Sequence, residues 1–409
     1  MRRYVPRRRV NLSLSMVPAV AGHFLGPRAR RASIVRELEL ALSGRFNGMP
    51  VLAVDSGRKA MVLILQAVTL QPGSRVLVPD YTLDSLALLI RDLGLQPVPV
   101  DVCTRDFNID PGLFEKAVLE HEPAVLVAPH MFGMPFDIRT IIDACKRHNI
   151  FLIEDCAHAL GTNYDGRQVG TFGDAAILSF SSIKAVHGLG GGAALFKDPE
   201  LAEKAQELIL ENVKGYEVGR IAGATLVEEL AFNPRLFGLL AGPLLSRPGF
   251  ADALRNLYRS GKSGHGTGNK RKKTVPRRIS GIQAALCLAG LKELGKGKNM
   301  RRKLSRIYRS GLQGIVHLQD IRQGSDPFPF AQVVRLDRPA REITGKLYKQ
   351  GIDAGKGLEI MQSCSKALGM PPLPNTKKLL ETCLELPMSS RMRDSDARRV
   401  VDALTSILE

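Results

Sequence analysis

The 409-residue sequence has no tryptophan, only 5% aromatic residues, and no apolar run near the ~20 residues that a bilayer-spanning helix needs. The longest candidate, "LFGLLAGPLL" at 236–245, is half that length. The six cysteines form no CxxC pair, which gives no support for a metal or redox motif and favours a reducing cytoplasm. They are Cys103, Cys145, Cys156, Cys287, Cys364 and Cys383. We expect a soluble, globular, cytoplasmic chain that is long enough for two domains.

Acidic residues are fewer than basic residues, 40 against 58, and the formal net charge is +18. The excess is clustered in residues 1–9, 28–31 and 268–278. The simplest interpretation is a solvated tail and a solvated loop, and the alternative is weak attraction to an anionic membrane surface or another polyanion. Residues 10–26 only loosely imitate a signal peptide, so we interpret residues 1–30 as a basic N-terminal arm.

What the chain does contain is an alternation of apolar, strand-like runs and amphipathic, helical stretches. Strands are expected at 74–80, 96–102, 124–130 and 150–156, and helices from about 83, at 111–121 and at 137–149. This spacing predicts βαβ crossovers and an α/β domain with a buried, mostly parallel sheet. Ligands bind beyond the carboxyl ends of such strands, where Asp80, His130 and Asp155 fall.

The pattern changes after Gly191, with a further strand and a helix expected at 199–213, and it becomes irregular and rich in proline and glycine over 223–278. Helical spacing resumes at Ser280. We predict a basic arm at 1–30, a large α/β domain at 31–260, a basic flexible loop at 261–279, and a smaller C-terminal α+β domain at 280–409.

One lysine stands out in "AAILSFSSIKAVHGLGGGAAL", residues 175–195. Lys184 follows a strand-like segment and precedes a glycine loop, so it is held near the carboxyl edge of the sheet, where backbone can approach a ligand closely. A lysine in that place could form a Schiff base. Taken alone, a surface charge is the simpler interpretation.

Two further motifs strengthen the case, together with Ser179, which stands five residues before Lys184 and could give its hydroxyl to a phosphate but is uninformative alone. Asp155 ends the apolar strand of "FLIEDCAHALG", where its carboxylate could pair with the pyridine nitrogen of pyridoxal phosphate, and His158 follows three residues later. In "VDSGRKAM", the Ser56-Gly57 turn opens a helix whose free amides could seat a phosphate. The simpler alternatives are a helix cap at Asp155, a core histidine at His158, and an ordinary capped helix after Ser56.

The chain carries, in this order, the Ser56-Gly57 turn, the strand-end Asp155, Ser179 and Lys184. With this order of residues it resembles the sugar aminotransferases of the DegT/DnrJ/EryC1/StrS family. The resemblance covers nearly the whole chain and is most specific from Ile153 to Lys184. It implies the pyridoxal-phosphate fold type I, with a mostly parallel sheet flanked by helices and a smaller C-terminal α+β domain.

The resemblance also implies the roles of the residues. Lys184 would bind pyridoxal 5′-phosphate and then move the reaction's proton, and Asp155 would hold the pyridine nitrogen. The other contacts to the cofactor would come from Ser56, Gly57, Arg58, His158 and Ser179. The family's usual reaction moves an amino group from glutamate or glutamine to a nucleotide-linked keto-sugar, for polysaccharide or secondary-metabolite biosynthesis, in a homodimer.

The sequence departs from the family at four places. Leu83 stands where an aromatic residue commonly stacks on the cofactor, Arg58 and Lys59 replace a small pair, Gly190 replaces a glutamate, and Pro276–Arg278 replaces an Asn-Tyr-Arg stretch. These departures indicate a divergent substrate pocket.

Two other functions stay open. A related sugar dehydratase is one, although such enzymes generally carry histidine where Lys184 stands. The other is a non-catalytic regulator or nucleic-acid-binding protein that keeps the fold, which the charge would suit. Against nucleic-acid binding, no helix-turn-helix, zinc or aromatic-basic motif is recognisable.

Overall fold

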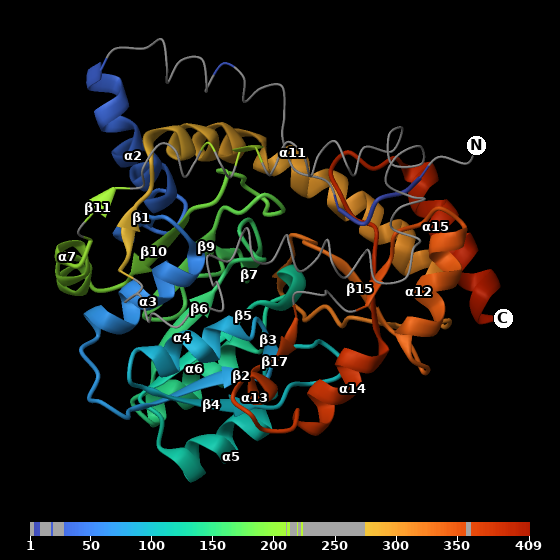
Figure 1. The fold of residues 1–409 in the computed structure, drawn as a ribbon, viewed down its shortest axis with the longest axis horizontal. Helices are drawn as coiled ribbons and strands as arrows, with labels where there is room; N and C mark the ends of the chain where they lie inside the picture. Colours follow the sequence, from blue (N-terminus) through green and yellow to red (C-terminus); the bar gives the residue numbers. More distant parts are fainter. Residues whose placement is uncertain are drawn as a thin grey trace.

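The computed structural model describes residues 4–8, 28–209, 211–212, 275–356 and 361–409, with the isolated positions 18, 219, 222 and 223. Within these residues, a large sheet with helices on both faces occupies one side of the molecule. A smaller antiparallel sheet with its own helices occupies the other side (Figure 1). One long helix, α11 (Gly281–Leu312), runs across both parts.

The large sheet has the strand order β11-β12-β1-β10-β9-β6-β5-β2-β4. Its strands are β1 Val51–Val54, β2 Arg75–Pro79, β4 Gln96–Val100, β5 Val125–Pro129, β6 Phe151–Asp155, β9 Ala175–Ser179, β10 Gly192–Phe196, β11 Glu211–Asn212 and β12 Arg277–Arg278. From β4 to β9 neighbouring strands run parallel, and β10 and β1 then continue antiparallel. This confirms the predicted α/β class with a mostly parallel sheet.

Two apolar layers cover the two faces of this sheet, because side chains alternate along each strand. On β2, Leu77 belongs to one cluster of buried residues, and Val76 and Val78 belong to the other. Helices of the first layer are α2 (Arg28–Ser43), α5 (Pro111–His121), α6 (Ile138–Arg147) and the first half of α11. Helices of the second layer are α3 (Gly57–Ala67), α4 (Ser85–Asp92) and α7 (Pro199–Glu207).

Helix α7 is shorter than the sequence predicts. It begins at the expected proline, with Asp198 as its N-cap, but it ends at Glu207 instead of continuing to residue 213. The next described strand residues, Glu211 and Asn212, pair with β12 at the edge of the large sheet. The demand for edge pairing therefore overrides the helical pattern there.

The smaller sheet has the order β13-β15-β18-β16 and is antiparallel. Its strands are β13 His317–Leu318, β15 Gln332–Arg335, β16 Gly355–Lys356 and β18 Cys383–Leu386, and helices α12 (Ala340–Lys349) and α15 (Asp394–Leu408) pack on it. Shorter elements complete the description: β3 Tyr81–Thr82, β7 Asn163–Tyr164, β8 Arg167–Gln168, β14 Ser325–Asp326, β17 Gln362–Ser363, α13 Cys364–Ala367, α14 Pro374–Thr382 and the 3₁₀ turn η1 Met131–Gly133.

Helix α11 begins with a full capping box, in which Ser280 and Gln283 satisfy each other's backbone amides. The first half of the helix contributes Cys287 and Leu291 to the core of the large sheet. The second half contributes Leu304 and Tyr308 to the core of the small sheet. The helix therefore ties the two sheets together.

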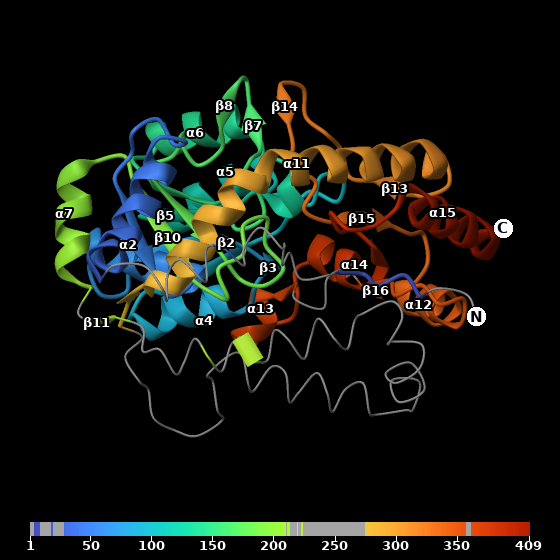
Figure 2. The ribbon, with the colours of Figure 1, turned by 90° about the horizontal axis from the view of Figure 1, so that it is seen from above.

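The start of the N-terminal arm is not a solvated tail. Tyr4 and Val5 are 6% and 3% exposed, and the Val5 amide donates to the Gly351 carbonyl at 2.8 Å. In return, the Asp353 amide donates to the Val5 carbonyl at 3.0 Å. Figure 2 shows this segment beside α12 and β16. The solvated interpretation is wrong for residues 4–8, because two apolar side chains among the arginines are buried against the small sheet and its helices.

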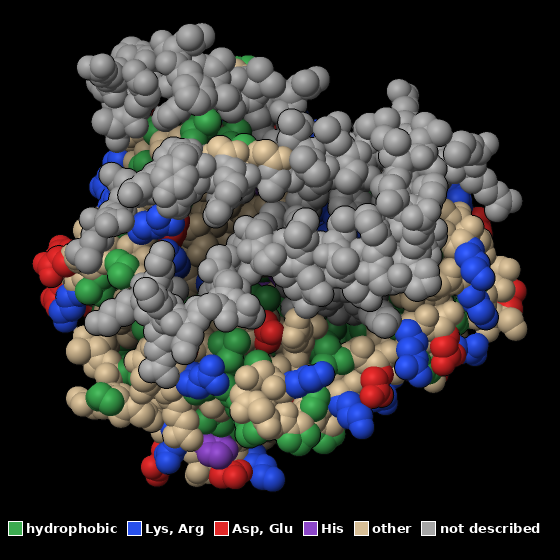
Figure 3. All heavy atoms as spheres, viewed as in Figure 1, with side chains coloured by type: hydrophobic (Ala, Val, Ile, Leu, Met, Phe, Trp, Pro, Cys, Tyr) green, Lys and Arg blue, Asp and Glu red, His purple; other side chains and the backbone are tan. Residues whose placement is uncertain are grey.

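Residues 268–274 of the third basic cluster and the apolar run at 236–245 lie outside the described residues, whereas residues 28–31 begin helix α2. On the face shown in Figure 3, the described Lys and Arg side chains stand next to Asp and Glu side chains rather than in one block. Within the described part of the chain, we find no helical segment with the length and apolar character of a membrane span.

Candidate active site

Three neighbouring parallel strands bring the predicted residues to one edge of the large sheet. Asp155 is the last residue of β6 and Ser179 the last residue of β9, and the register pairs Asp155 with Pro129 on one side and Ile177 on the other. Lys184 follows Ser179 in the connection from β9 to β10. Asp155 and Ser179 therefore lie at the carboxyl edge of the sheet, as expected, and Lys184 follows in the connection that leaves this edge.

The glycine loop folds back onto the end of β9. The Phe180 amide donates to the Gly191 carbonyl at 2.9 Å, and the Gly188 amide donates to the Phe180 carbonyl at 2.9 Å. Gly190 and Gly191 have φ values of 99° and 95°, a region that glycine adopts without steric cost. The loop that carries Lys184 is thus held tightly over the sheet edge, and Gly190, one of the departures from the family, meets a backbone requirement.

The Ser56-Gly57 turn packs directly against Ser179 and the glycine loop. A Cβ on Gly57 would lie 3.0 Å from the Ser179 Cβ, and a Cβ on Gly192 would lie only 2.4 Å from the Gly57 nitrogen. Ser56 also forms a β-bridge with Gly191. The close approach that glycine permits brings the predicted phosphate turn and the predicted serine together.

Helix α3 starts at this turn. The Ser56 Oγ accepts a hydrogen bond from the Lys59 amide at 3.3 Å, so Ser56 is an N-cap, as the simpler interpretation proposed. A capped helix still leaves first-turn amides without intrahelical acceptors, and here those of Gly57 and Arg58 are such amides. The turn can therefore be both a cap and an anion seat.

Arg58 and Lys59 have different environments. The Lys59 Nζ donates to the Asp55 Oδ2 at 2.8 Å and to the Val275 carbonyl at 3.0 Å, which commits it to a structural ion pair. Burial lowers the pKa of Arg58, and the charge of Asp84 opposes that shift. Among the described residues, the Arg58 side chain has no hydrogen-bond partner. Of the two cations, Arg58 is the one available to a ligand.

Lys184 and Asp155 influence each other inside a partly buried site. Burial lowers the pKa of Lys184 to about 7, the negative charge of Asp155 opposes the shift, and the positive charge of Arg8 adds to it. Burial raises the pKa of Asp155, while the Ala157 amide, which donates to its Oδ1 at 2.9 Å, and then Lys184 favour the charged carboxylate. A lysine near its midpoint at neutral pH can serve as nucleophile and proton carrier.

Two phenylalanines that the sequence analysis did not predict line the site. The His158 ring stacks on Phe330 at 4.2 Å between centroids and lies 6.1 Å from Phe132, nearly parallel to both. The Lys184 Nζ lies 4.8 Å from the centre of the Phe330 ring. Burial, followed by the charges of Lys184 and Arg8, holds the pKa of His158 well below its usual value. A neutral His158 therefore stands beside Lys184.

Glu154, which the sequence analysis did not single out, anchors the end of β6. Its two carboxylate oxygens accept from the amides of Gly170, Phe172 and Gly173 at 2.7–2.8 Å, and its Oε2 lies 2.9 Å from the His130 Nε2. Burial raises its pKa, but these hydrogen bonds, His130 first, hold it below its usual value.

Cys156 completes a buried trio with His130 and Glu154 whose ligand atoms lie within 4.8 Å of one another. The Glu154 oxygens are already committed to three amides and an imidazole, which indicates a structural clamp and not a metal ligand. The clamp fixes the residue immediately before Asp155.

Two departures from the family pattern are explained by packing within the chain. Leu83 packs against the second apolar layer of the sheet. In the stretch that replaces Asn-Tyr-Arg, the Arg277 Nε donates to the Asp55 Oδ2 at 3.1 Å and the Arg278 Nη2 donates to the Gln206 Oε1 at 2.7 Å. Both arginines thus have partners in their own chain.

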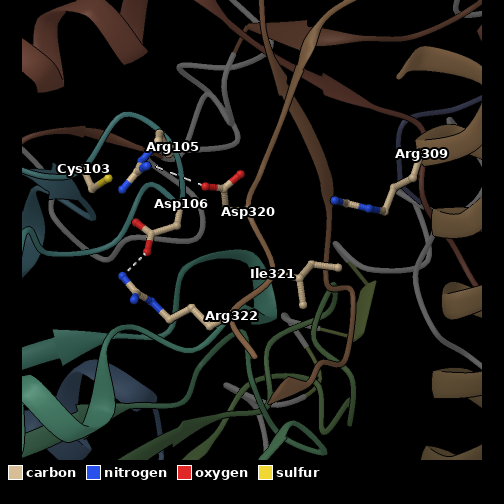
Figure 4. Close-up of a pocket in the computed structure, with 7 residues that line it drawn as sticks. All are labelled: Cys103, Arg105, Asp106, Arg309, Asp320, Ile321 and Arg322. Carbon is tan, nitrogen blue, oxygen red and sulfur yellow. Dashed lines mark hydrogen bonds and ion pairs between the residues drawn. The ribbon is translucent and has the colours of Figure 1, made fainter. Parts of the chain in front are cut away.

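A separate cavity of about 360 Å³ lies between the loop after β4 and the segment between β13 and β14 (Figure 4). Its charged walls are largely paired, with Arg322 at 2.6 Å from Asp106 and Arg105 at 4.0 Å from Asp320. The seven predicted site residues do not line it; its lining residues are Cys103, Arg105, Asp106, Arg309, Asp320, Ile321 and Arg322.

The order of the strands and the lysine, aspartate and glycine turn at their carboxyl edge define the class of pyridoxal-phosphate enzymes of fold type I. Residues 29–247 and 244–405 match the DegT/DnrJ/EryC1/StrS aminotransferase family. The chain belongs to this family, as the sequence motifs indicated, and is an aminotransferase-family enzyme.

Curated relatives agree with this assignment. The chain is 28% identical over 359 residues to the dTDP-3-amino-3,4,6-trideoxy-alpha-D-glucose transaminase of Streptomyces venezuelae, a match that covers 86% of this chain and 81% of that protein. It is 34% identical over 220 residues to the lipopolysaccharide biosynthesis protein RfbH of Salmonella typhimurium, covering 47% and 50% of the two chains. It is also 34% identical over 181 residues to a pleiotropic regulatory protein of Geobacillus stearothermophilus, covering 44% and 48%.

Solved structures share the fold over nearly the full length. A DegT DnrJ EryC1 StrS aminotransferase from Brucella abortus has a TM-score of 0.74 at 20% identity, covering 96% of this chain and 95% of that one. Spr1654 from Streptococcus pneumoniae, solved in its PLP form, has a TM-score of 0.76 at 19% identity, covering 99% and 98%.

Proposed function

We propose that this protein is a pyridoxal 5′-phosphate-dependent aminotransferase that moves an amino group from glutamate or glutamine to a nucleotide-linked keto-sugar. One observation carries the proposal: Lys184, with a pKa of about 7, lies beside the strand-end carboxylate of Asp155 in a partly buried site. Such a pair is costly for stability, because burial opposes both charges, and pairs of this kind are concentrated at functional sites.

The residues present fit the cofactor. Glycine at positions 57 and 192 lets the phosphate turn pack tightly against Ser179 and the glycine loop, because an added Cβ would lie 3.0 Å from the Ser179 Cβ or 2.4 Å from the Gly57 nitrogen. The first-turn amides of α3 start at this contact. We assign the phosphate to Ser56, Gly57 and Ser179, with Arg58 adding its charge. Asp155 would hold the pyridine nitrogen, and the neutral His158 would lie near the ring.

When bound, the cofactor supplies an electron sink for the carbon that gains or loses nitrogen. The protein supplies the acid–base chemistry around that carbon. Lys184, near its midpoint at neutral pH, can take a proton at Nζ and return it. Asp155, whose Oδ1 accepts a hydrogen bond from the Ala157 amide, would offer its carboxylate to the ring nitrogen. Phe330 and Phe132, stacked with His158, would help to exclude water from this site.

The relatives support a sugar as the amino acceptor. One is named as a transaminase of a dTDP-linked amino sugar, and another as a lipopolysaccharide biosynthesis protein. We therefore favour a nucleotide-linked keto-sugar, used for polysaccharide or a secondary metabolite. Glutamate or glutamine as donor, and a homodimer with the cofactor near its interface, are part of the same proposal.

A regulator is the second candidate, because one relative is named a pleiotropic regulatory protein. The two candidates differ in the chemistry of Lys184, since a regulator that merely keeps the fold has no need for a lysine of lowered pKa beside Asp155.

The test is amine transfer by the purified protein. Wild-type protein is incubated with pyridoxal 5′-phosphate, ¹⁵N-labelled glutamate or glutamine, and a panel of nucleotide keto-sugars, and the products are analysed by mass spectrometry. We expect ¹⁵N in one nucleotide sugar, and none with Lys184→Ala. A colourless protein that transfers no nitrogen to any acceptor would favour the regulator. Sedimentation of the same preparation tests the dimer.

A further inference from the structure

The described end of the N-terminal arm brings an arginine to the small sheet. The Arg8 Nε donates to the Glu385 Oε1 at 2.8 Å and its Nη2 donates to the Glu385 Oε2 at 2.7 Å, a bidentate pair. Glu385 is 1% exposed, whereas the Arg8 side chain is 20% exposed. The backbone next to this pair is also fixed, because the Met388 amide donates to the Arg7 carbonyl at 2.9 Å.

This pairing leaves part of the guanidinium available. A guanidinium has five N–H donors, and Glu385 takes two of them along the Nε–Nη2 edge. The remaining donors, on Nη1 and Nη2, form a second edge that matches a carboxylate. Glu385 thus orients Arg8 while leaving that edge to a ligand.

A series of contacts in the small sheet connects Arg8 with the surroundings of Lys184. On β18, Glu385 pairs in register with Val333 of β15, and Phe330 precedes that strand by two residues. The Phe330 carbonyl accepts a hydrogen bond at 2.6 Å from the Nη1 of Arg301, a buried residue whose pKa is lowered to about 10 by burial and then by Arg8. The Phe330 ring in turn faces Lys184. Arg8 is also close enough for its charge to act on Lys184 and His158.

We propose that Arg8, oriented by Glu385, binds the carboxylate of the amino donor at the site of Lys184. This inference rests on the proposed aminotransferase function and specifies which residue recognises the donor. The N-terminal arm, predicted from sequence as a solvated basic segment, is on this account a wall of the active site.

An anion near Arg8 could come from the donor's carboxylate or from the diphosphate of a nucleotide sugar. In an α-amino acid, the carboxylate is one bond from the carbon that carries the nitrogen, so it must lie close to the Lys184 Nζ. In a nucleotide sugar, the ring separates the diphosphate from the reacting carbon. Because the charge of Arg8 reaches both Lys184 and His158, the donor carboxylate is the better match.

The experiment separates the two half-reactions in the full-length protein loaded with pyridoxal 5′-phosphate. Single-turnover spectra are recorded with L-glutamate and with L-glutamine, and then with a nucleotide keto-sugar, for wild type, Arg8→Gln and Arg8→Lys. Arg7→Gln is the matched control, because Arg7 lies in the same arm, 3.7 Å from the Glu385 Oε2, whereas the bidentate pair with Glu385 is formed by Arg8. Calorimetric titration with 2-oxoglutarate, which has carboxylates and no amine, measures binding without turnover.

We expect Arg8→Gln to raise the donor concentration for half-maximal reaction, and the dissociation constant of 2-oxoglutarate, by about 10- to 100-fold, the scale of one hydrogen bond to a charged group. Arg8→Lys should lie between that variant and wild type, and Arg7→Gln should resemble wild type. The acceptor constant should stay within about twofold, because the diphosphate lies elsewhere.

An unchanged donor constant in Arg8→Gln overturns the inference, as does an equal loss in Arg7→Gln. A shift in the acceptor constant alone would reassign Arg8 to the diphosphate. If wild type binds 2-oxoglutarate in an Arg8-dependent way but transfers no nitrogen, the carboxylate site stands and the proposed aminotransferase function fails.

Discussion

The Lys184 Nζ lies 4.8 Å from the centre of the Phe330 ring. This contact connects the edge of the large sheet with the segment that enters the small sheet. A cation over an aromatic face is stabilised, typically by about 0.5–2 kcal/mol. Burial has the opposite effect on the ammonium and lowers the pKa of Lys184 to about 7. The site therefore holds a lysine that can exist in both protonation states at neutral pH.

The first prediction concerns the effect of pH on stability. The pKa of Lys184 is about 7 when folded and 10.5 in the reference state, so from pH 7 to about pH 10 the unfolded chain binds more protons. Stability must then rise with pH in this window. In urea unfolding of the cofactor-free protein, wild type should gain stability relative to Lys184→Met between pH 7 and about pH 9.5. Parallel curves for the two proteins would show that Lys184 has an ordinary pKa.

Asp155→Asn should lower the turnover of the loaded enzyme by about a hundredfold or more, the scale for loss of one electrostatic stabiliser. Asparagine keeps an oxygen that can accept from the Ala157 amide, so the fold should persist. The control is Asp165→Asn, an exposed carboxylate that pairs with Arg139. Near-normal turnover in Asp155→Asn would mean that the ring nitrogen is held by another group.

Arg58 and Lys59 provide a matched pair for the phosphate seat. Arg58→Ala should weaken binding of pyridoxal 5′-phosphate by about 1.5–3 kcal/mol, the range for a hydrogen bond to a charged group. Lys59→Ala should leave that affinity nearly unchanged, because Lys59 is committed to Asp55 and Val275. Equilibrium titration of the apo protein measures both. Equal affinities in wild type and Arg58→Ala would leave the phosphate to the backbone amides alone.

Gly192→Ala should disrupt the contact between the strand that follows the glycine loop and the Ser56-Gly57 turn. The added Cβ would lie 2.4 Å from the Gly57 nitrogen and 2.6 Å from the Leu178 carbonyl oxygen, both backbone atoms that cannot rotate away. We expect a loss of stability at or above the upper end of the roughly 1–3 kcal/mol range for overpacking. Gly297→Ala in α11, where a Cβ meets nothing within 4 Å, should instead gain about 0.5–1 kcal/mol. Thermal unfolding of both variants decides, and a wild-type melting temperature for Gly192→Ala contradicts the packing.

The parts of the site that the sequence could predict lie close together in the chain. Apolar runs separated by helical spacing predicted the parallel strands, and with them the edge where Asp155 and Ser179 meet. The glycine-rich loop predicted the position of Lys184. Such local patterns determine secondary structure and the polarity of a sheet, so they also determine which residues share its carboxyl edge.

The residues that the sequence could not predict approach the site from distant segments. Phe330 comes close to Lys184 because the segment entering the small sheet lies against the edge of the large sheet. Arg8 comes close enough for its charge to act on Lys184, and its guanidinium pairs with Glu385 of β18. Glu154 adjoins Asp155 in sequence, yet its partners lie in the loop at Gly170–Gly173. The position of that loop cannot be predicted from the direction of the strands. The apolar Tyr4 and Val5, set among arginines, were the available signal that the arm is buried.

The most direct test of the account is the covalent attachment of the cofactor. Purified protein is mixed with pyridoxal 5′-phosphate, reduced with borohydride, digested, and analysed by mass spectrometry, with Lys184→Arg as the control. The account predicts one reduced pyridoxyl-phosphate group on the peptide that contains Lys184, and none in the control. A stoichiometric adduct on another lysine, or equal labelling of wild type and Lys184→Arg, would contradict it.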